Sequence, residues 1–274
     1  MTPFEFASSG LPRRLLLASL TPLILLSCEV SQEQESAIGE GTAREIESQL
    51  PLVRDPWINA YVNELGDTIA MRTSRSDLDW RFVVVNSPQI NAFALPGGYI
   101  YVNRGLIEAT SNFSELAGVL GHEIGHVVMR HSVEQMQSRQ KIGVVAELTC
   151  VLTSLCESGL GQAAINIGGT ALISRHSRQD EFEADSAAVE NVLLAGIDPD
   201  GIPALFEVLM RARQRSPGVV ESWFSTHPLE ESRIENSRRL IDKAGADEVR
   251  GLVKQIPSYG EFKRRVSLLP YPGR

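Results

Sequence analysis

The stretch Gly121-His122-Glu123-Ile124-Gly125-His126 decides how the rest of the chain is interpreted. It contains the pattern H-E-x-x-H, and its surroundings predict a helix. At helical spacing His122 and His126 lie on one face about one turn apart, so both imidazoles can reach a single metal ion. Glu123 lies about 100° further round the helix, where it can address a water bound to that ion. The pattern predicts a metal site, and other segments must complete it.

The helix around this pattern has its own start signal. Asn112-Phe113-Ser114-Glu115 has the form of a capping box, which predicts a helix from there to about Gln135. His131 would fall on its apolar stripe, about 140° from His126, which favours a hydrogen-bonded packing role and not a metal ligand. Helical glycine is destabilising by roughly 0.5–1 kcal/mol relative to alanine, so a glycine row beside the histidines predicts close approach of another backbone. The stripe consists of Leu116, Leu120, Ile124 and Val127, and the glycines are Gly118, Gly121 and Gly125.

Length and charge narrow the class of protein. The 274 residues suffice for one large domain or two small ones. The formal net charge of −8, with no basic run to offset it, argues against a nucleic-acid surface.

The N-terminal segment predicts export. Arg13 and Arg14 precede a short apolar run over 15–26, and Ser27-Cys28 follows it, which is the pattern of a secretory signal. The run is too short for a comfortable membrane span. Leu25-Leu26-Ser27-Cys28 resembles the lipobox of bacterial lipoproteins, in which the signal is cut before a cysteine that becomes lipid-modified. We expect a lipid anchor at Cys28 on the periplasmic side of the outer membrane; a plain signal peptide and a soluble periplasmic protein are the alternative.

The composition divides the chain into four parts. The segment after Cys28 is polar and suits a tether, with helix expected only over Ala43–Gln49. The predicted parts are a signal peptide at 1–27, a polar tether at 28–52, a metallopeptidase domain at 53–245, and a C-terminal tail at 246–274 packed on that domain.

A packing helix and a small β region are expected before the H-E-x-x-H helix. The helix begins at Pro56 and carries apolar residues at helical intervals through Ala70. Strands are predicted at 80–85, 91–95 and 99–102, and Pro96-Gly97-Gly98 predicts a turn between the last two. An open strand edge there could bind an extended substrate through main-chain hydrogen bonds, or the hairpin could be ordinary core.

The most apolar stretch after the leader runs from 143 to 173. Ser158-Gly159-Leu160-Gly161 divides it into two helical halves, neither of them suited to cross a bilayer. A buried helix pair is favoured over an amphipathic lid or membrane-facing hairpin. Cys150 and Cys156 could form a disulfide only if the chain turns near Thr153-Ser154, because six residues of straight helix would separate them too far.

A second segment offers the missing metal ligand. A helix capped by Ser177 would place Glu181 and Asp185, spaced i and i+4, on one face, and Gly196 predicts its end. Glu181 could then bind the metal, while Asp185 accepts the other ring N–H of a liganding histidine and fixes its orientation. The alternative is a solvated acidic helix start attracted by the helix dipole.

Four ordered segments resemble the gluzincin metallopeptidases related to the CAAX prenyl endoprotease and to bacterial HtpX. They are H-E-I-G-H at 122–126, E-F-E-A-D at 181–185, the strand segment at 91–102, and Ser225-Thr226-His227-Pro228 followed by Arg233-Ile234. The likeness covers about 53–245 and is greatest to the soluble periplasmic branch. It implies a mainly helical α+β fold, a zincin-like domain with a small sheet or hairpin beside the H-E-x-x-H helix.

The resemblance also implies roles for single residues. His122, His126 and Glu181 become the ligands of one Zn²⁺ per chain, and Glu123 becomes the general base and proton shuttle. Asp185 becomes an orienting group or a proton donor, of which the residue spacing favours the orienting role. His227 would lie near the metal and either stabilise the oxyanion or plug the open coordination position. The resemblance implies no role for His176, which is interpreted as a surface or loop residue.

The function expected from this resemblance is zinc-dependent endopeptidase activity in envelope protein quality control. Unfolded or misassembled envelope proteins would be the substrates, and no nucleic acid is expected as a partner. A non-proteolytic chaperone or assembly factor for outer-membrane proteins on the same fold is the alternative. A closed structural zinc site with four protein ligands is a third hypothesis. The presence of Glu123, a base that a structural site does not need, argues against it.

Overall fold

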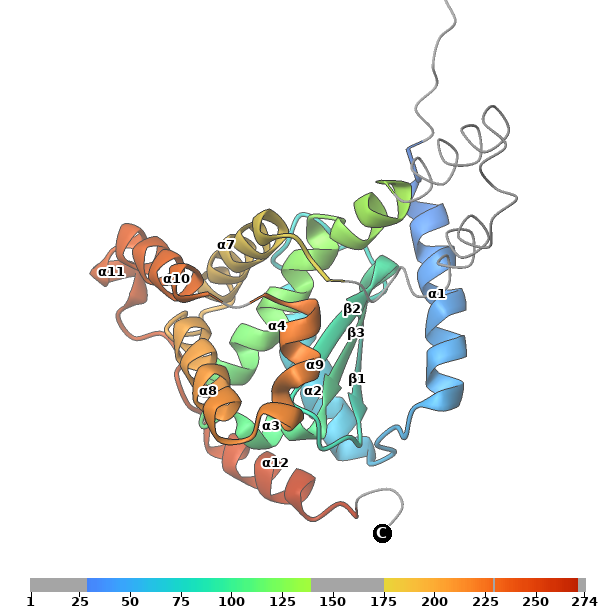
Figure 1. The fold of residues 1–274 in the computed structure, drawn as a ribbon. Helices are drawn as coiled ribbons and strands as arrows, with labels where there is room; N and C mark the ends of the chain where they lie inside the picture. Colours follow the sequence, from blue (N-terminus) through green and yellow to red (C-terminus); the bar gives the residue numbers. More distant parts are fainter. Residues whose placement is uncertain (1–28, 139–174, 229, 271–274) are drawn as a thin grey trace, which may run out of the picture.

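The computed structural model describes residues 29–138, 175–228 and 230–270. The predicted signal peptide, Cys28, the apolar stretch at 143–173, and Cys150 and Cys156 lie outside these residues. The described chain is mainly helical around one three-stranded sheet (Figure 1), which confirms the predicted α+β class. None of its helices is both long and apolar enough to cross a membrane.

The predicted β hairpin is present, and it forms two of the three strands of the sheet. Strand β2 (Ala92–Leu95) pairs antiparallel with β3 (Tyr99–Asn103), and β1 (Arg81–Val85) pairs parallel with β3 on its other side. The strand order β1-β3-β2 makes β2 an edge strand. The hairpin turn is a short 3₁₀ segment, Pro96–Gly98, in which Gly97 has a φ of 79°, a conformation that glycine adopts without steric penalty.

The two faces of the sheet are covered by different helices because strand side chains alternate in direction. One face packs against α1 (Gln32–Gln49), and the other against α2 (Pro56–Ala70) and α4 (Phe113–Val128) (Figure 1). The α1 face consists of Val83, Val85, Leu95 and Tyr101, and the opposite face includes Phe82, Val84, Ile100 and Val102.

Helix α1 is longer than the sequence predicted. It begins at Gln32, with Ser31 in a complete capping box, whereas helix was expected only from Ala43. Glu35 is buried, and both of its carboxylate oxygens accept hydrogen bonds from Arg75, at 2.7 and 3.0 Å. The segment predicted as a free tether is thus packed against the sheet through most of its length, because a buried ion pair and small residues fix it there. The domain boundaries themselves stay a prediction.

Helix α4 begins as predicted and ends earlier. The Asn112 side chain accepts a hydrogen bond from the Glu115 backbone N–H at 3.0 Å. The Glu115 carboxylate accepts from the backbone N–H of Ser111 and from the side-chain amide of Asn112, and not from the backbone N–H of Asn112 as a capping box requires. The helix ends at Val128, not near Gln135, because Arg130 adopts a positive φ of 61°. A separate helical segment then runs over 131–138.

The glycine row on α4 receives two other helices, as predicted. α7 (Arg178–Leu194) is capped by Ser177 and ends before Gly196, and α8 (Gly201–Arg215) follows it. A Cβ at Gly125 would lie 2.7 Å from the carbonyl oxygen of Ala184 on α7. A Cβ at Gly121 would meet Val192 and Ala188 on α7, and a Cβ at Gly118 would meet Ile202 on α8.

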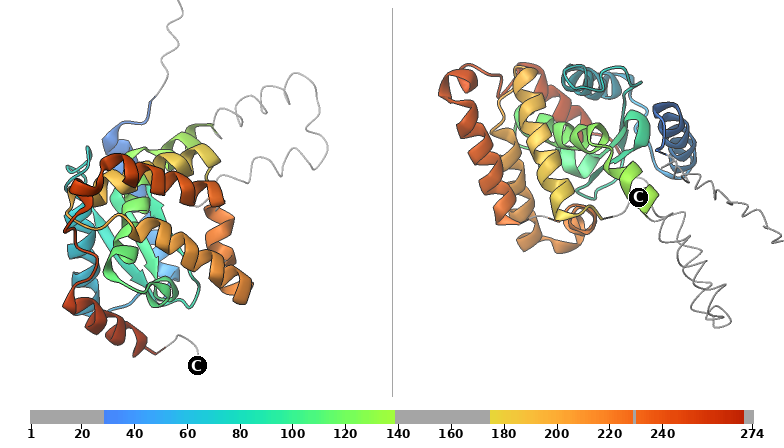
Figure 2. Two further views of the ribbon diagram at one scale, coloured as in Figure 1. Left: turned by 90° about the vertical axis from the view of Figure 1, so that its left-hand side faces the viewer. Right: turned by 90° about the horizontal axis from the view of Figure 1, so that it is seen from above.

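The remaining helices complete the layer around α7 and α8. Seen from above, α10, α7, α4 with the sheet, and α1 follow one another across the molecule (Figure 2). The last helix packs against α2 and α3 through Tyr259, Phe262 and Val266. The bounds are α3 Arg104–Ala109, α9 Pro217–Thr226, α10 Glu231–Ala244, α11 Ala246–Val249 and α12 Pro257–Ser267.

Candidate metal and catalytic site

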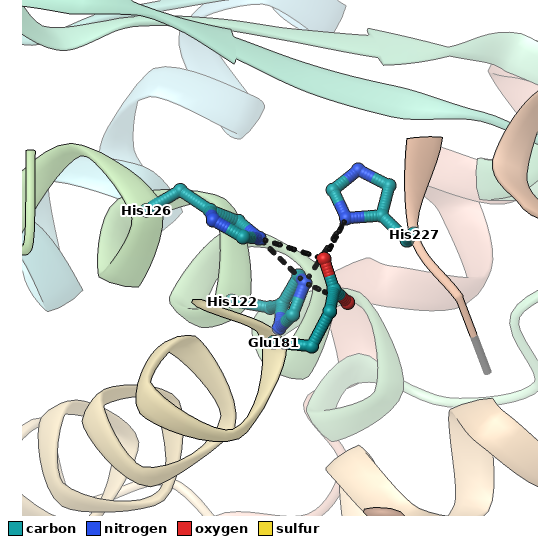
Figure 3. A group of neighbouring side chains, drawn as sticks. All are labelled: His122, His126, Glu181 and His227. Atoms are coloured by element: carbon teal, nitrogen blue, oxygen red, sulfur yellow. Dashed lines mark hydrogen bonds and ion pairs between the residues drawn. The ribbon is translucent and has the colours of Figure 1, made fainter. Parts of the chain in front are cut away.

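Four buried side chains converge where α4, α7 and the end of α9 meet (Figure 3). They are His122, His126, Glu181 and His227, whose potential ligand atoms lie within 4.8 Å of one another. The Nε2 atoms of His122 and His126 are 3.1 Å apart, and each lies 3.5 Å from an oxygen of Glu181. Nδ1 of His227 lies 3.1 Å from Glu181 Oε1 and 3.4 Å from His122 Nε2. Residues distant in the sequence therefore form one compact donor set.

The donor set fits a tetrahedral metal ion. Zinc binds histidine nitrogen and carboxylate oxygen at about 2.0–2.2 Å, which puts tetrahedral donors roughly 3.3–3.6 Å from one another. The five contacts described above run from 3.1 to 3.5 Å. His122, His126 and Glu181 could therefore hold such an ion, and His227 is placed at a fourth position.

Glu123 lies beside this cluster with no hydrogen-bond partner. Its side chain is fully buried, and neither carboxylate oxygen accepts a hydrogen bond from the described residues. Nε2 of His227 lies 3.5 Å from its Oε1. A buried carboxylate without partners is unfavourable unless a charge or water meets it. The position suits a group that receives a proton from a water at the cluster.

The charges of the site favour a divalent cation. The carboxylates of Glu123, Glu181 and Asp185 are all buried and face a single buried guanidinium, that of Arg233. With the histidines neutral, the form in which imidazole binds a metal, a cation of charge +2 would compensate for the two remaining negative charges.

Asp185 and Arg233 contact His122 and Glu181 on the sides of these residues that face away from the cluster. Asp185 Oδ1 lies 2.9 Å from Nδ1 of His122, leaving Nε2 of that ring directed into the cluster. Arg233 donates to both oxygens of Asp185 at 2.7 Å, contacts Glu181 Oε2 through Nη1, and donates to the Pro228 carbonyl at 3.0 Å. The sequence marks Arg233 only as part of the motif that begins at Ser225. Its role could not be recognised there, because an arginine on an amphipathic helix is usually solvated.

The surroundings shift the pKa values of the ligand groups. Burial lowers the pKa of His122, but its interactions with Asp185 and Glu181 outweigh this and raise it to about 9. Burial, together with the nearby imidazole of His176, holds the pKa of His126 well below its usual value. Burial raises the pKa of Glu181, but its interactions with His227 and Arg233 outweigh this and hold the pKa well below its usual value.

Two further histidines lie closer to the site than the sequence indicated. His131 is a buried, hydrogen-bonded histidine as predicted, but it contacts His126, with 2.9 Å between their Nδ1 atoms. The break at Arg130 places it there, whereas a continuous helix would not. His176 precedes α7 in a loop, yet the surface interpretation is wrong. Its ring stacks on that of His126 at 3.8 Å between centroids, and its side chain is only 12% exposed.

An H-E-x-x-H helix, a small sheet beside it and a glutamate from a second helix define a zincin-like domain. The chain belongs to Peptidase family M48, whose profile matches residues 54–241, and the resemblance stated from the sequence is confirmed.

Relatives from bacteria and from a yeast share this region. The chain is 31% identical over 220 residues to the "Beta-barrel assembly-enhancing protease" of Escherichia coli (strain K12), covering 77% of this chain and 44% of that protein. The protein of the same name from Yersinia pestis is also 31% identical, covering 78% of this chain and 45% of its own length. The "Mitochondrial metalloendopeptidase OMA1" of Schizosaccharomyces pombe is 30% identical over 222 residues, covering 79% and 64%. The chain thus spans less than half the length of these two bacterial relatives.

Proposed function

We propose that this chain is a zinc-dependent endopeptidase that hydrolyses peptide bonds. The observation that carries the proposal is the fully buried carboxylate of Glu123, which accepts no hydrogen bond from the described residues and lies beside the donor set of His122, His126 and Glu181. A closed structural zinc site has no use for such a group, whereas peptide hydrolysis requires a base at this place. Membership of Peptidase family M48 supports the same activity.

In this mechanism His122, His126 and Glu181 would hold one zinc ion per chain. Its Lewis acidity would lower the pKa of water at the site to about 7 and polarise the substrate carbonyl. Glu123 accepts the proton of the attacking water on a carboxylate oxygen and returns it to the leaving amine. Asp185 holds the ring of His122 through Nδ1, so that Nε2 remains free as a ligand atom.

His227 is the residue whose role the sequence left open between oxyanion stabilisation and plugging. We propose that it plugs the site, because its Nδ1 lies at contact distance from Glu181 and His122 and so occupies a fourth donor position. A water needs that position during catalysis. His227 follows directly on α9, and its departure would open the site to substrate and would free Glu123 Oε1 from its neighbour.

The substrate would bind as an extended chain along β2. This strand is an edge of the sheet, and its partner β3 lies on the other side only. Main-chain hydrogen bonds along such an edge would ignore side-chain identity, which suits unfolded or misassembled proteins. The name of the bacterial relatives, beta-barrel assembly-enhancing protease, supports envelope proteins as the substrate class. The leader pattern supports a lipid anchor at Cys28 on the periplasmic side of the outer membrane.

The test is a comparison of the full chain with Glu123→Gln in casein digestion, together with metal analysis of both. We expect one zinc per chain in each protein and a loss of about 10²–10⁴-fold in cleavage rate for the variant, since a general base contributes that much. The control is Glu134→Gln, an exposed glutamate beyond α4. Full proteolysis by Glu123→Gln would refute the proposal, and an envelope-assembly function that survives the substitution would favour the chaperone alternative.

A further inference from the structure

His126 has a different supporting partner from His122. Asp185 contacts the ring of His122, whereas His131 contacts the ring of His126. Nε2 of His126 faces the metal cluster, 3.1 Å from Nε2 of His122. Its other nitrogen, Nδ1, lies 2.9 Å from Nδ1 of His131. Nε2 of His131 lies in turn 3.3 Å from Oε2 of Glu183, whose other oxygen accepts a hydrogen bond from Gln179 at 2.8 Å. A continuous chain of contacts therefore runs from Glu183 to the metal-facing nitrogen.

The hydrogen atoms of this chain can be placed in one consistent way. A neutral imidazole carries a single N–H, and the nitrogen that binds a metal must be the one without it. If His126 binds through Nε2, its hydrogen is on Nδ1, and Nδ1 of His131 must accept it. The hydrogen of His131 is then on Nε2, where the carboxylate of Glu183 accepts it. Each hydrogen bond from His126 to Glu183 then has one donor and one acceptor.

We propose that His131 and Glu183 are positioning residues for His126, fixing its tautomer and ring orientation for metal binding. The inference rests on the proposed zinc function. It gives α7 three separate carboxylates for one site. Glu181 faces the metal cluster, Asp185 holds His122 directly, and Glu183 holds His126 through His131.

The backbone break after α4 is what makes the contact possible. On a continuous helix His131 would lie about 140° from His126 and would point away from it. The positive φ of Arg130 ends α4 and changes the direction of the backbone, so that His131 is buried in contact with His126. Two contacts to the N-terminal part of the described chain fix Arg130 in this conformation. Its Nε lies 2.9 Å from Oε2 of Glu35 on α1, and its Nη2 donates to the carbonyl of Val30, two residues before α1.

A second metal ion is the competing use of this cluster, because His126, His131 and His176 also lie within 4.8 Å of one another. The ring of His176 stacks on His126 with 25° between their planes, so its nitrogens point along that ring and not toward a point shared with Nδ1 of His126. Nδ1 of His176 is also 3.0 Å from the amide nitrogen of Gln135, which can only donate to it. The geometry therefore favours positioning over a second ion.

The experiment measures zinc affinity of the full chain by competition with a chromophoric chelator, with zinc as the only probe. His131→Phe keeps an aromatic ring and removes both nitrogens, while His131→Asn keeps an acceptor two bonds from Cβ, as Nδ1 is. Glu183→Gln removes the charge at the end of the chain. Glu190→Gln, an exposed glutamate on the same helix, is the matched control. Unfolding of the metal-free proteins shows whether each variant is folded, and the visible spectrum of the cobalt-substituted proteins reports ligand geometry.

We expect His131→Phe to weaken zinc binding by about 10–100-fold, the usual effect of removing a group that orients a ligand. His131→Asn should recover part of this loss, Glu183→Gln should lose less than His131→Phe, and Glu190→Gln should bind as the parent does. The cobalt spectrum should change in His131→Phe only. If folded His131→Phe bound zinc as tightly as the parent with an unchanged cobalt spectrum, the inference would be wrong. Two zinc ions in the parent and one in His131→Phe would also overturn it, whereas a parent that binds no zinc would refute the proposed function itself.

Discussion

Arg233 and Asp185 form a two-pronged ion pair in the interior of the protein. Nε of Arg233 donates to Oδ2 and Nη2 donates to Oδ1, both at 2.7 Å, and Arg233 is only 1% exposed. The same Oδ1 lies 2.9 Å from Nδ1 of His122. The carboxylate on α7 is thus held from α10 on one side and meets the metal-site helix α4 on the other. The pair connects three helices through one side chain.

Removal of the guanidinium should therefore destabilise the fold as well as the site. We predict that Arg233→Met lowers the free energy of unfolding of the metal-free protein by about 3–5 kcal/mol, because Asp185 and Glu181 are left buried without their cation. Arg233→Lys should recover only part of this, since an ammonium group cannot reproduce the planar double contact. Urea unfolding measures both changes. Arg238→Met, on the exposed side of the same helix, is the control, and an equal effect there would argue against a special role for Arg233.

A methyl group on α4 should separate the two halves of the site. At Gly125 a Cβ would lie 2.7 Å from the backbone oxygen of Ala184, so Gly125→Ala forces α7 away and should cost about 1–3 kcal/mol of stability. Gly41→Ala, on the exposed face of α1 with nothing within 4 Å of the new atom, should instead stabilise by roughly 0.5–1 kcal/mol. Urea unfolding of the two variants should give changes of opposite sign. A stabilising Gly125→Ala would show that α7 does not need this close contact.

Metal removal should be visible in thermal stability. With zinc at about one hundred times its dissociation constant, the folded state gains about 2.7 kcal/mol, which corresponds to a melting temperature roughly 5–10 °C higher for a domain of this size. A chelator should reverse the shift, and Mg²⁺ should not replace zinc, because it prefers an all-oxygen octahedral shell. Differential scanning calorimetry with each ion measures the two shifts in melting temperature. An equal shift with Mg²⁺ would contradict a site built from histidine nitrogens.

The plugging role of His227 predicts a gain of activity when the ring is removed. If the open form of the parent is populated at about 10%, His227→Ala should increase peptide cleavage about tenfold, since the competent state no longer has to be selected. The same variant should bind zinc more weakly, because one donor is lost. Peptide cleavage and chelator competition on the same preparation measure the two effects. A fall in kcat with unchanged zinc affinity would instead favour oxyanion stabilisation.

Local patterns determined which helices and strands form. The capping residues Asn112 and Ser177 and the Pro96-Gly97-Gly98 turn act through neighbours in the sequence, and the structure confirms the element that each of them predicts. The glycine row on α4 also predicted its own packing, because glycine inside a helix is unfavourable unless another backbone needs the space.

The misjudged positions share one physical cause, which is that their conformation depends on distant partners. Arg130 ends α4 against its sequence pattern because Glu35 and the Val30 carbonyl hold it. The N-terminal half of α1 is ordered by Arg75, and His176 is brought onto His126 by folding alone. None of these contacts has a signature in the residues beside it.

The sequence by itself thus determined the family and the fold class, through the resemblance of four ordered segments, and it determined the helices that carry H-E-x-x-H and the later glutamate, through helical periodicity and local caps. Only the tertiary structure decided what surrounds His122 and His126. The orientation of each imidazole depends on a partner from another helix, Asp185 held by Arg233 in one case and His131 in the other. Those partners are fixed by burial and charge pairing across the fold, and sequence spacing does not encode such distances.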